Sequence, residues 1–289
     1  LKMKDELVKA LALDGHVRIY IARTTNMVQE ARDRFDMGPV ATDALGRVLS
    51  VASIMGGMLK SDKEMLTISI NGHGPIGSIT VDAYSNGNVR GFVSNPHVDA
   101  KNVGEAVGTD GTLTVIKDLN MAENFTGTVE LQSGEIGSDF TYYFTLSEQT
   151  PSAVSVGVAF DSTGTVEGAG ALVLQMMPDA TDTDIRIVEH VIEGLKPMST
   201  IIKEYGDTDM SQLAHDLFDD AKVLETSDIH YSCPCSKERT RNILMTLSKD
   251  ELQKMIDEDE GCEVTCNFCN EHYTFTKDEL KEILEDMNA

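Results

Sequence analysis

Residues 39–60 read Pro-Val-Ala-Thr-Asp-Ala-Leu-Gly-Arg-Val-Leu-Ser-Val-Ala-Ser-Ile-Met-Gly-Gly-Met-Leu-Lys, and this stretch decides the fold. Gly38 and Pro39 open a helical segment that carries few charges beyond Asp43 and Arg47. A helix that is apolar on most of its faces must be covered by other elements. We therefore expect a helix buried inside a large N-terminal domain.

Apolar runs on both sides of this helix predict the strands that cover it. Before it, Val17, Ile19 and Ile21 alternate with more polar side chains in a strand, and a polar helix follows. After it, turns rich in Asn and Gly divide residues 65–93 into two or three strands. The remaining elements expected before residue 180 are strands at 112–117, 125–131, 153–160 and 169–177, and a helix that begins within 134–144.

The pattern changes after residue 180. Residues 181–195 carry apolar side chains at helical spacing behind a Thr/Asp-rich start, and Pro197 separates them from further short helices. A strand at 222–231 then leads into a segment that contains most of the cysteines. We predict an α+β protein with an N-terminal domain of mixed or antiparallel sheet (1–180), a helical linker (181–231) and a small C-terminal α+β domain (232–289).

Four of the five cysteines form two close pairs, Cys233-Pro-Cys235 and Cys266-Asn-Phe-Cys269, with 30 residues between the pairs. Two such pairs in a compact domain can supply four thiolates to a tetrahedral Zn²⁺ ion. The same thiols can be oxidised to disulfides once the metal leaves, because the thiolate is both the ligand and the oxidisable species. We expect a metal site at Cys233, Cys235, Cys266 and Cys269.

Several other interpretations of the cysteines remain open. The site can be a purely structural zinc knuckle, which is the commoner use of such pairs. A thioredoxin-like redox pair fits poorly, because no βαβ pattern precedes the second pair. His230 or His272 could replace a sulfur ligand, although four thiols already complete a closed site. Cys262 is either a spectator, a competing ligand or a partner in disulfide exchange.

The composition and motifs of the chain argue against several classes of function. The formal net charge is −24 and no segment is basic, which argues against nucleic-acid binding. Apolar stretches end well before the length that a membrane helix needs, so we expect no membrane partner. The chain begins Leu1-Lys2-Met3-Lys4 without an apolar signal core, which argues against a secreted protein stabilised by disulfides. No phosphate loop or nucleophile elbow is present, and we expect no enzymatic activity.

The cysteine spacing, together with motifs elsewhere, resembles the bacterial heat-shock 33-kilodalton chaperonin family of redox-regulated holdases. Residues 134–153, with Tyr-Tyr-Phe-Thr-Leu-Ser-Glu-Gln at 142–149, are similar to a signature of that family's N-terminal domain. Residues 168–180 and the Gly-Pro-Ile-Gly at 74–77 are similar to it as well. The resemblance spans almost the whole chain.

This resemblance implies a cytoplasmic, ATP-independent chaperone that is idle while its four thiolates hold one zinc ion. Peroxide with heat, or hypochlorous acid, then forms the disulfides Cys233–Cys235 and Cys266–Cys269, expels zinc and unfolds the C-terminal domain with the linker. The resemblance also implies unfolded or oxidatively damaged proteins as clients and a homodimer as the active form. Cys262 is not part of the family motif.

The linker supplies a candidate surface for clients. Its apolar side chains lie at amphipathic spacing, beside the adaptable side chains of Met176 and Met177. Permanent packing of this face onto the N-terminal domain is the alternative. Two other functions stay open, a zinc-ribbon nucleic-acid-binding protein and a thiol–disulfide oxidoreductase. The candidate client-binding residues are Ile185, Val188, Ile192, Leu195, Met198, Ile201 and Ile202.

Overall fold

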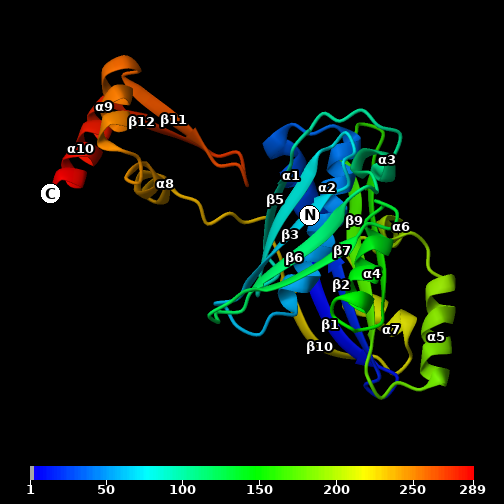
Figure 1. Ribbon diagram of the computed structural model, residues 1–289. Coiled ribbons are helices and arrows are strands. Elements are labelled where there is room, and N and C mark those ends of the chain that lie inside the picture. The colour runs from blue at the N-terminus through cyan, green and yellow to red at the C-terminus, as the bar shows by residue number, and fades with distance from the viewer. Residues whose placement is uncertain (1–2) are drawn as a thin grey trace. The chain divides into compact units, whose positions relative to one another are not determined.

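The structure of the chain is a computed structural model that describes residues 3–289. Leu1 and Lys2, which begin the predicted N-terminal domain, lie outside the described residues. The chain divides into two compact units, one ending at Ser232 and the other spanning Cys233–Ala289. Both units combine helices with antiparallel strands, which confirms the predicted α+β class (Figure 1).

Helix α2 (Pro39–Gly57) is the buried helix that its sequence predicts. Pro39 stands in its first turn, where the missing N–H group leaves no helical hydrogen bond unmade. Glycines allow other elements to approach closely. A Cβ atom on Gly56 would lie only 2.4 Å from the carbonyl oxygen of Tyr84. The expectation that this helix is covered by other elements is therefore confirmed.

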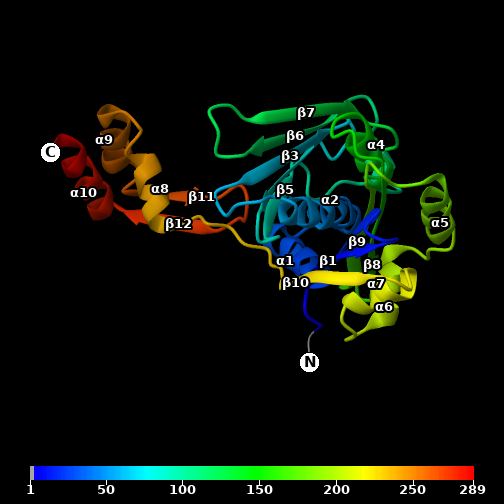
Figure 2. The same cartoon turned by 90° about the horizontal axis from the view of Figure 1, so that it is seen from below.

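Two five-stranded antiparallel sheets enclose α2 (Figure 2). The first has the order β10-β1-β2-β9-β8 and the second the order β5-β4-β3-β6-β7. The strands of the first sheet are β1 (Glu6–Ala12), β2 (Val17–Arg23), β8 (Ser152–Phe160), β9 (Val166–Met176) and β10 (Lys222–Asp228). Those of the second are β3 (Met65–Asn71), β4 (Ser78–Tyr84), β5 (Val89–Val93), β6 (Thr112–Asp118) and β7 (Phe125–Glu130).

Three further helices complete the part of the first unit that precedes the linker, namely α1 (Thr25–Phe35), α3 (Val103–Val107) and α4 (Gly137–Leu146). The loop before α4 is organised by Asp139, which is fully buried. Its carboxylate accepts hydrogen bonds from the main-chain N–H groups of Gln132, Ser133 and Ile136 at 2.7–3.0 Å. These bonds fold the chain into a tight turn and start α4 with a capping interaction.

The predicted linker consists of α5 (Asp182–Glu193), α6 (Met198–Tyr205), α7 (Ser211–Leu217) and strand β10. Thr181 and Asp184 form a capping box that begins α5. Helices α6 and α7 lie on the face of the first sheet that points away from α2 (Figure 2), and α5 contributes Val188 to the same apolar cluster. Strand β10 pairs with β1, more than 200 residues away in sequence. In this structure residues 181–231 thus belong to the first compact unit.

The chain between β10 and the first cysteine is held along strand β5. Val89 donates its N–H to the carbonyl of His230, at 3.1 Å, and accepts a bond from the N–H of Ser232, at 2.8 Å. The hydroxyl of Tyr231 donates to the carbonyl oxygen of Gly91, at 2.9 Å. Residues 229–232 therefore form an ordered exit from the first unit.

The second unit is small. It contains α8 (Lys237–Leu244), α9 (Lys249–Glu258), the hairpin β11 (Gly261–Thr265) and β12 (His272–Thr276), and α10 (Lys277–Asn288). A capping box formed by Ser248 and Glu251 begins α9. The buried apolar side chains of its core are Leu244, Leu252, Ile256, Phe275, Leu280 and Ile283. A core of this size contributes only a few kcal/mol to folding, typically about 3–5 kcal/mol at most.

Among residues 3–289, no helix combines the length and the apolar character that crossing a membrane requires.

Candidate metal centre

The first pair of cysteines lies on the irregular segment that enters the second unit. Cys235 directly precedes Ser236, whose hydroxyl caps α8 by accepting a 3.1 Å bond from the N–H of Arg239. Pro234 separates the two thiols and restricts the main chain between them. The start of α8 therefore fixes the position of this pair.

The second pair lies in the turn between β11 and β12. Cys266 donates its N–H to the carbonyl of Glu271 at 2.9 Å and accepts a bond from the N–H of Asn270 at 2.8 Å. Asn270 has a φ of 62°, a left-handed conformation that Asn adopts more readily than most residues. The hairpin closes on itself at this point and carries Cys266 and Cys269 at its end.

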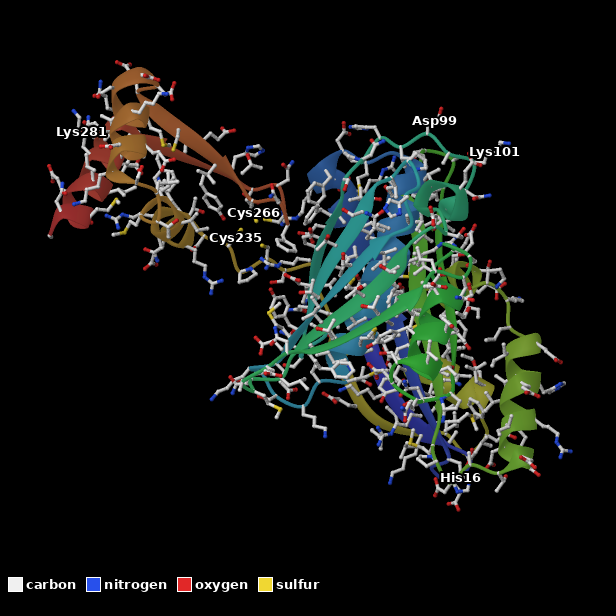
Figure 3. The ribbon with its side chains drawn as sticks, in the orientation of Figure 1. His16, Asp99, Lys101, Cys235, Cys266 and Lys281 are labelled. Atoms are coloured by element: carbon white, nitrogen blue, oxygen red, sulfur yellow. The ribbon has the colours of Figure 1, made fainter. Side chains whose placement is uncertain are left out.

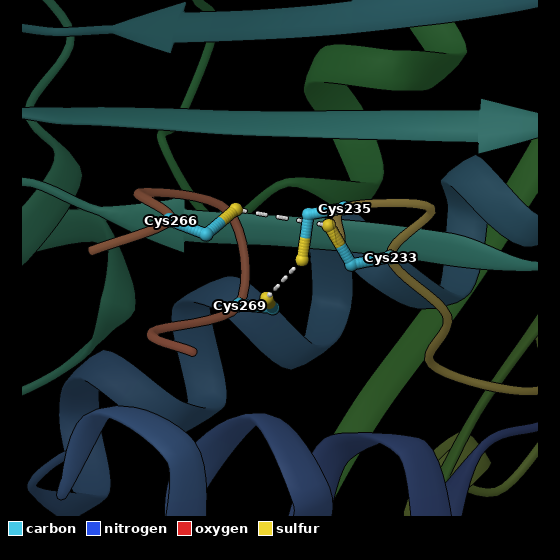
Figure 4. Close-up of side chains that lie close together, drawn as sticks. All are labelled: Cys233, Cys235, Cys266 and Cys269. Atoms are coloured by element: carbon cyan, nitrogen blue, oxygen red, sulfur yellow. Dashed lines mark hydrogen bonds between the residues drawn. The ribbon is translucent and has the colours of Figure 1, made fainter. Parts of the chain in front are cut away.

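The four sulfur atoms come together as the spacing predicts (Figure 4). The Sγ atoms of Cys233 and Cys266 lie 3.8 Å apart and those of Cys235 and Cys269 lie 3.4 Å apart. All four lie within 4.8 Å of one another. Four sulfur ligands at about 2.3 Å from a tetrahedral zinc ion would be about 3.8 Å apart. The donor set therefore fits a single tetrahedrally coordinated metal ion.

The surroundings of the sulfur atoms disfavour charge on the thiols themselves. Cys269 is 1% exposed, and its burial raises the pKa of its thiol far above the ordinary value. Burial also raises the pKa of Cys235. The hydroxyl of Tyr273 lies 3.0 Å from the sulfur of Cys235, and this hydrogen bond raises the pKa of the tyrosine. A cation in the site would supply the charge that thiolates here require.

The alternative ligands lie outside the cluster. Within residues 3–289, the one group that could hold a metal consists of the four paired cysteines. The Nδ1 atom of His272 lies 3.1 Å from both the Thr265 hydroxyl and the Glu263 carboxylate. Cys262 is half-buried in β11 opposite Phe275, and burial raises the pKa of its thiol. Figure 3 labels Cys235 and Cys266, which represent the two pairs.

The candidate client-binding residues are placed on the linker helices, and most of them are covered. Val188, Met198, Ile201 and Ile202 are at most 6% exposed and belong to a core shared with β1, β2 and β9. Leu195 packs at the margin of that core. Ile185 and Ile192 are 40% and 37% exposed. Their role in binding clients stays a prediction.

The surface that these helices cover is not evident from the local sequence. Its apolar rows lie on three adjacent strands and alternate with residues that face α2. Only the β2 row was recognised from its alternation, because the sequences of β1 and β9 lack a two-residue period. The members of the covered face are Val8, Ala10, Ala12, Val17, Ile19, Ile21, Leu172 and Leu174.

A model of the family described as "Hsp33 protein" matches residues 5–276. A 33 kDa chaperonin of Bacillus cytotoxicus is 48% identical over 293 residues, covering 99% of this chain and all of that protein. Proteins of the same name from Bacillus cereus and Bacillus anthracis are 47% identical over 292 residues, with the same coverage. The crystal structure of a 33 kDa chaperonin from Thermotoga maritima is similar, with a TM-score of 0.88, 34% identity and 98% of each chain covered. With its fold and its cluster of four thiols, the chain therefore belongs to the Hsp33 family.

Proposed function

We propose that the chain is an ATP-independent chaperone that holds unfolding proteins after oxidation of its four-thiol site. Relatives named 33 kDa chaperonins support the chaperone assignment. The observation that carries the redox part is the cluster of four thiols in a small unit directly after the linker. A holdase makes and breaks no covalent bond in its client, so we propose no enzymatic activity.

We propose Zn²⁺ as the metal, one ion per chain in the reduced form. Four sulfur ligands at tetrahedral spacing form a closed site, which suits structural zinc and leaves no position for a reacting water. Binding of zinc to such sites contributes about 10–16 kcal/mol in small peptides. This exceeds what the core of residues 233–289 supplies, so folding of the second unit depends on the metal.

Oxidation would remove the ligands. We propose that each thiolate pair loses two electrons to one molecule of oxidant. Hydrogen peroxide takes up two protons from solvent and is reduced to two water molecules, or hypochlorous acid takes up one proton and is reduced to chloride and water. The bonds formed are the disulfides Cys233–Cys235 and Cys266–Cys269, as the family resemblance implies. Disulfide sulfur is a poor metal ligand, so zinc affinity is lost and the second unit unfolds.

The first unit supplies the surface that such unfolding would uncover. The linker helices cover a contiguous apolar face of the first sheet. Large exposed apolar surfaces bind other proteins, so release of the linker would create a binding site for unfolded clients. The covering helices carry apolar residues of their own, which can bind clients as well.

We propose unfolded or oxidatively damaged proteins as clients, a homodimer as the active form and the cytoplasm as the location. The formal charge of −24 supports a protein that stays dissolved while it exposes apolar surface. The same charge disfavours nucleic acid as a partner. We propose no membrane partner.

The test compares reduced and oxidised protein in the presence of a thermally unfolding model client. Light scattering reports client aggregation, and a chromophoric chelator reports released zinc. We expect the oxidised protein to suppress aggregation in proportion to zinc release, and the reduced protein to have no effect. Equal suppression by both forms would contradict redox regulation. Catalytic turnover in an insulin-reduction assay would instead favour an oxidoreductase, and a salt-dependent shift of labelled RNA or DNA a nucleic-acid-binding protein.

A further inference from the structure

The apolar face beneath the linker ends in a charged pair. Glu6 on β1 stands directly opposite Arg23 on β2, and both lie on the face that the linker helices cover. The side chains of this pair are 7% and 3% exposed, and they lie 3.3 Å apart. A buried ion pair is often no more stabilising than apolar residues of the same volume. Its other contacts therefore matter for its role.

Every further hydrogen bond of this pair joins a main-chain atom. Within the sheet, Arg23 Nε donates to the carbonyl oxygen of Lys4 at 2.7 Å. The Nη1 atom of Arg23 donates to the carbonyl oxygens of Gly206 and Thr208 at 3.0 and 2.9 Å. The carboxylate of Glu6 accepts a bond from the N–H group of Met210.

These three linker residues belong to the loop between α6 and α7, residues 206–210, which turns its main chain inward. Asp207, Thr208 and Asp209 are exposed, and Gly206 has no side chain. Only Met210 places its side chain in the core. The ion pair therefore hydrogen-bonds to carbonyl and N–H groups, which every polypeptide carries, and not to the side chains of the three residues in between.

We propose that Arg23 and Glu6 form a main-chain-binding site, occupied by the linker loop in the reduced protein and by unfolded client polypeptide once the linker has left. This proposal rests on the proposed holdase function and adds a binding mode to it. Donors and acceptors on the main chain of an unfolded protein are abundant, so the site needs no particular client sequence. The adjoining apolar rows then hold the client's side chains.

Once the linker has left, Arg23 and Glu6 need main-chain groups of another polypeptide as hydrogen-bond partners. Two carbonyl oxygens and one N–H group leave Arg23 and Glu6 together when the linker dissociates. A client laid over the neighbouring apolar rows excludes water from the pair. Charged groups that are desolvated without hydrogen bonds are strongly unfavourable. The bound client must therefore present main-chain groups here, or bind more weakly.

The variant Arg23→Lys tests this role, because it keeps the positive charge beside Glu6 but cannot donate to two carbonyl groups in the same fork geometry. Lys203→Gln is the matched control. It removes an exposed ion pair between α6 and Glu167 of β9, at 3.0 Å, and so loosens the linker without touching the main-chain site. Both variants are prepared as full chains and fully oxidised.

The probes are a reduced, carboxymethylated polypeptide and a short apolar peptide with an analogue whose central amides are replaced by esters. We expect Arg23→Lys to bind the polypeptide about tenfold more weakly than wild type, and Lys203→Gln to bind it as wild type does. Wild type should prefer the amide peptide over the ester analogue, because ester carbonyls accept hydrogen bonds less well. Arg23→Lys should lose that preference.

Each outcome decides the proposal. Binding by Arg23→Lys at wild-type strength would make the pair a latch for the linker and nothing more, which overturns the client site. If Arg23→Lys fails to fold, equal binding of the amide and ester peptides by wild type overturns it independently. If oxidised wild type binds no probe at all, the holdase function fails together with the proposal. If wild type binds both peptides equally but still suppresses aggregation, only the main-chain site fails.

Discussion

Replacing Phe275 by alanine tests whether zinc binding and folding of the second unit are one event. Phe275 is 2% exposed, lies on β12 in the small core of residues 233–289 and packs beneath the ammonium group of Lys237, 5.1 Å from the ring centre. Truncation of a buried Phe to Ala typically costs about 3–5 kcal/mol. None of the four thiols is changed by this substitution.

The expected result is a loss of zinc affinity. If residues 233–289 are unfolded without metal, every kcal/mol removed from the core is subtracted from the free energy of zinc binding. A loss of about 3–5 kcal/mol corresponds to a dissociation constant raised about 150- to 5,000-fold. The affinity is measured for the reduced protein by competition with a chromophoric chelator.

The control is Ile243→Ala on α8, in the same unit. This side chain is 63% exposed, so its truncation should change the affinity by no more than about twofold. A zinc affinity of Phe275→Ala within about threefold of wild type would refute the reasoning, because the unit would then fold without metal. Loss of zinc could not unfold it in that case.

Three further results are expected. Cys266→Ser should abolish zinc binding and leave the second unit unfolded even when reduced, whereas Cys262→Ser should keep one zinc per chain; X-ray absorption and metal analysis check both. On oxidation, amide hydrogen exchange should accelerate throughout residues 181–289 and not in the rest of the first unit. Ile202→Ala truncates a fully buried side chain, so it should weaken docking of the linker by about 2–5 kcal/mol and lower the oxidant concentration at which this exchange accelerates. The main-chain N–H groups of Leu13 and Asp14 hold the pKa of Asp220 below its ordinary value of 3.8. The ionised carboxylate therefore stabilises docking of the linker above pH 3.8, and this contribution is lost as the pH falls through the lowered pKa. Asp220→Asn should remove this pH-dependent step from the amide-exchange rates of the linker measured at acid pH.

Much of the fold could be predicted from local sequence patterns. The long apolar helix was predicted at 39–60 and spans Pro39–Gly57, because its apolar faces and its Gly-Pro start are visible in sequence. The strands at 153–160 and 169–177 were predicted within three residues at each end. The pairing of strands that are distant in the sequence could not be predicted. No strand was predicted before Val17, whereas Glu6–Ala12 forms β1 and pairs on one side with β10. Pairing with the neighbouring strands makes this segment a strand, because its own sequence, Glu-Leu-Val-Lys-Ala-Leu-Ala, has no alternation of apolar and polar residues.

The thiol site was predictable for a related reason. Cysteine pairs at short spacing define a ligand set by their residue type and spacing alone, and the fold brings all four sulfur atoms together. The hydroxyl of Tyr273 beside Cys235 was not anticipated, because nothing in the local sequence marks that residue as a neighbour of a thiol 38 positions away. The pair of Glu6 and Arg23 was missed for the same reason. Its partners come from a loop 183 to 204 residues downstream.

The short connection between β9 and the linker has a consequence for client release in the proposed mechanism. β9 ends at Met176 and α5 begins at Asp182, so a released linker stays tethered to the sheet that it covered. The N–H of Met177 bonds to the carbonyl oxygen of His16 at 2.8 Å, and Asp184 at the start of α5 accepts a 2.7 Å bond from the same histidine, at the turn shown in Figure 3. A short tether keeps a segment at an effective concentration of about a millimolar.

In the proposed mechanism, a bound client would compete with the tethered linker for the same face of the sheet. While the second unit is unfolded, docking of the linker would be weakened and the client would stay bound. After reduction of the thiols and renewed metal binding, the linker would return at its high local concentration and displace the client. Metal binding and refolding would then supply the free energy for client release, so the proposed cycle needs no nucleotide.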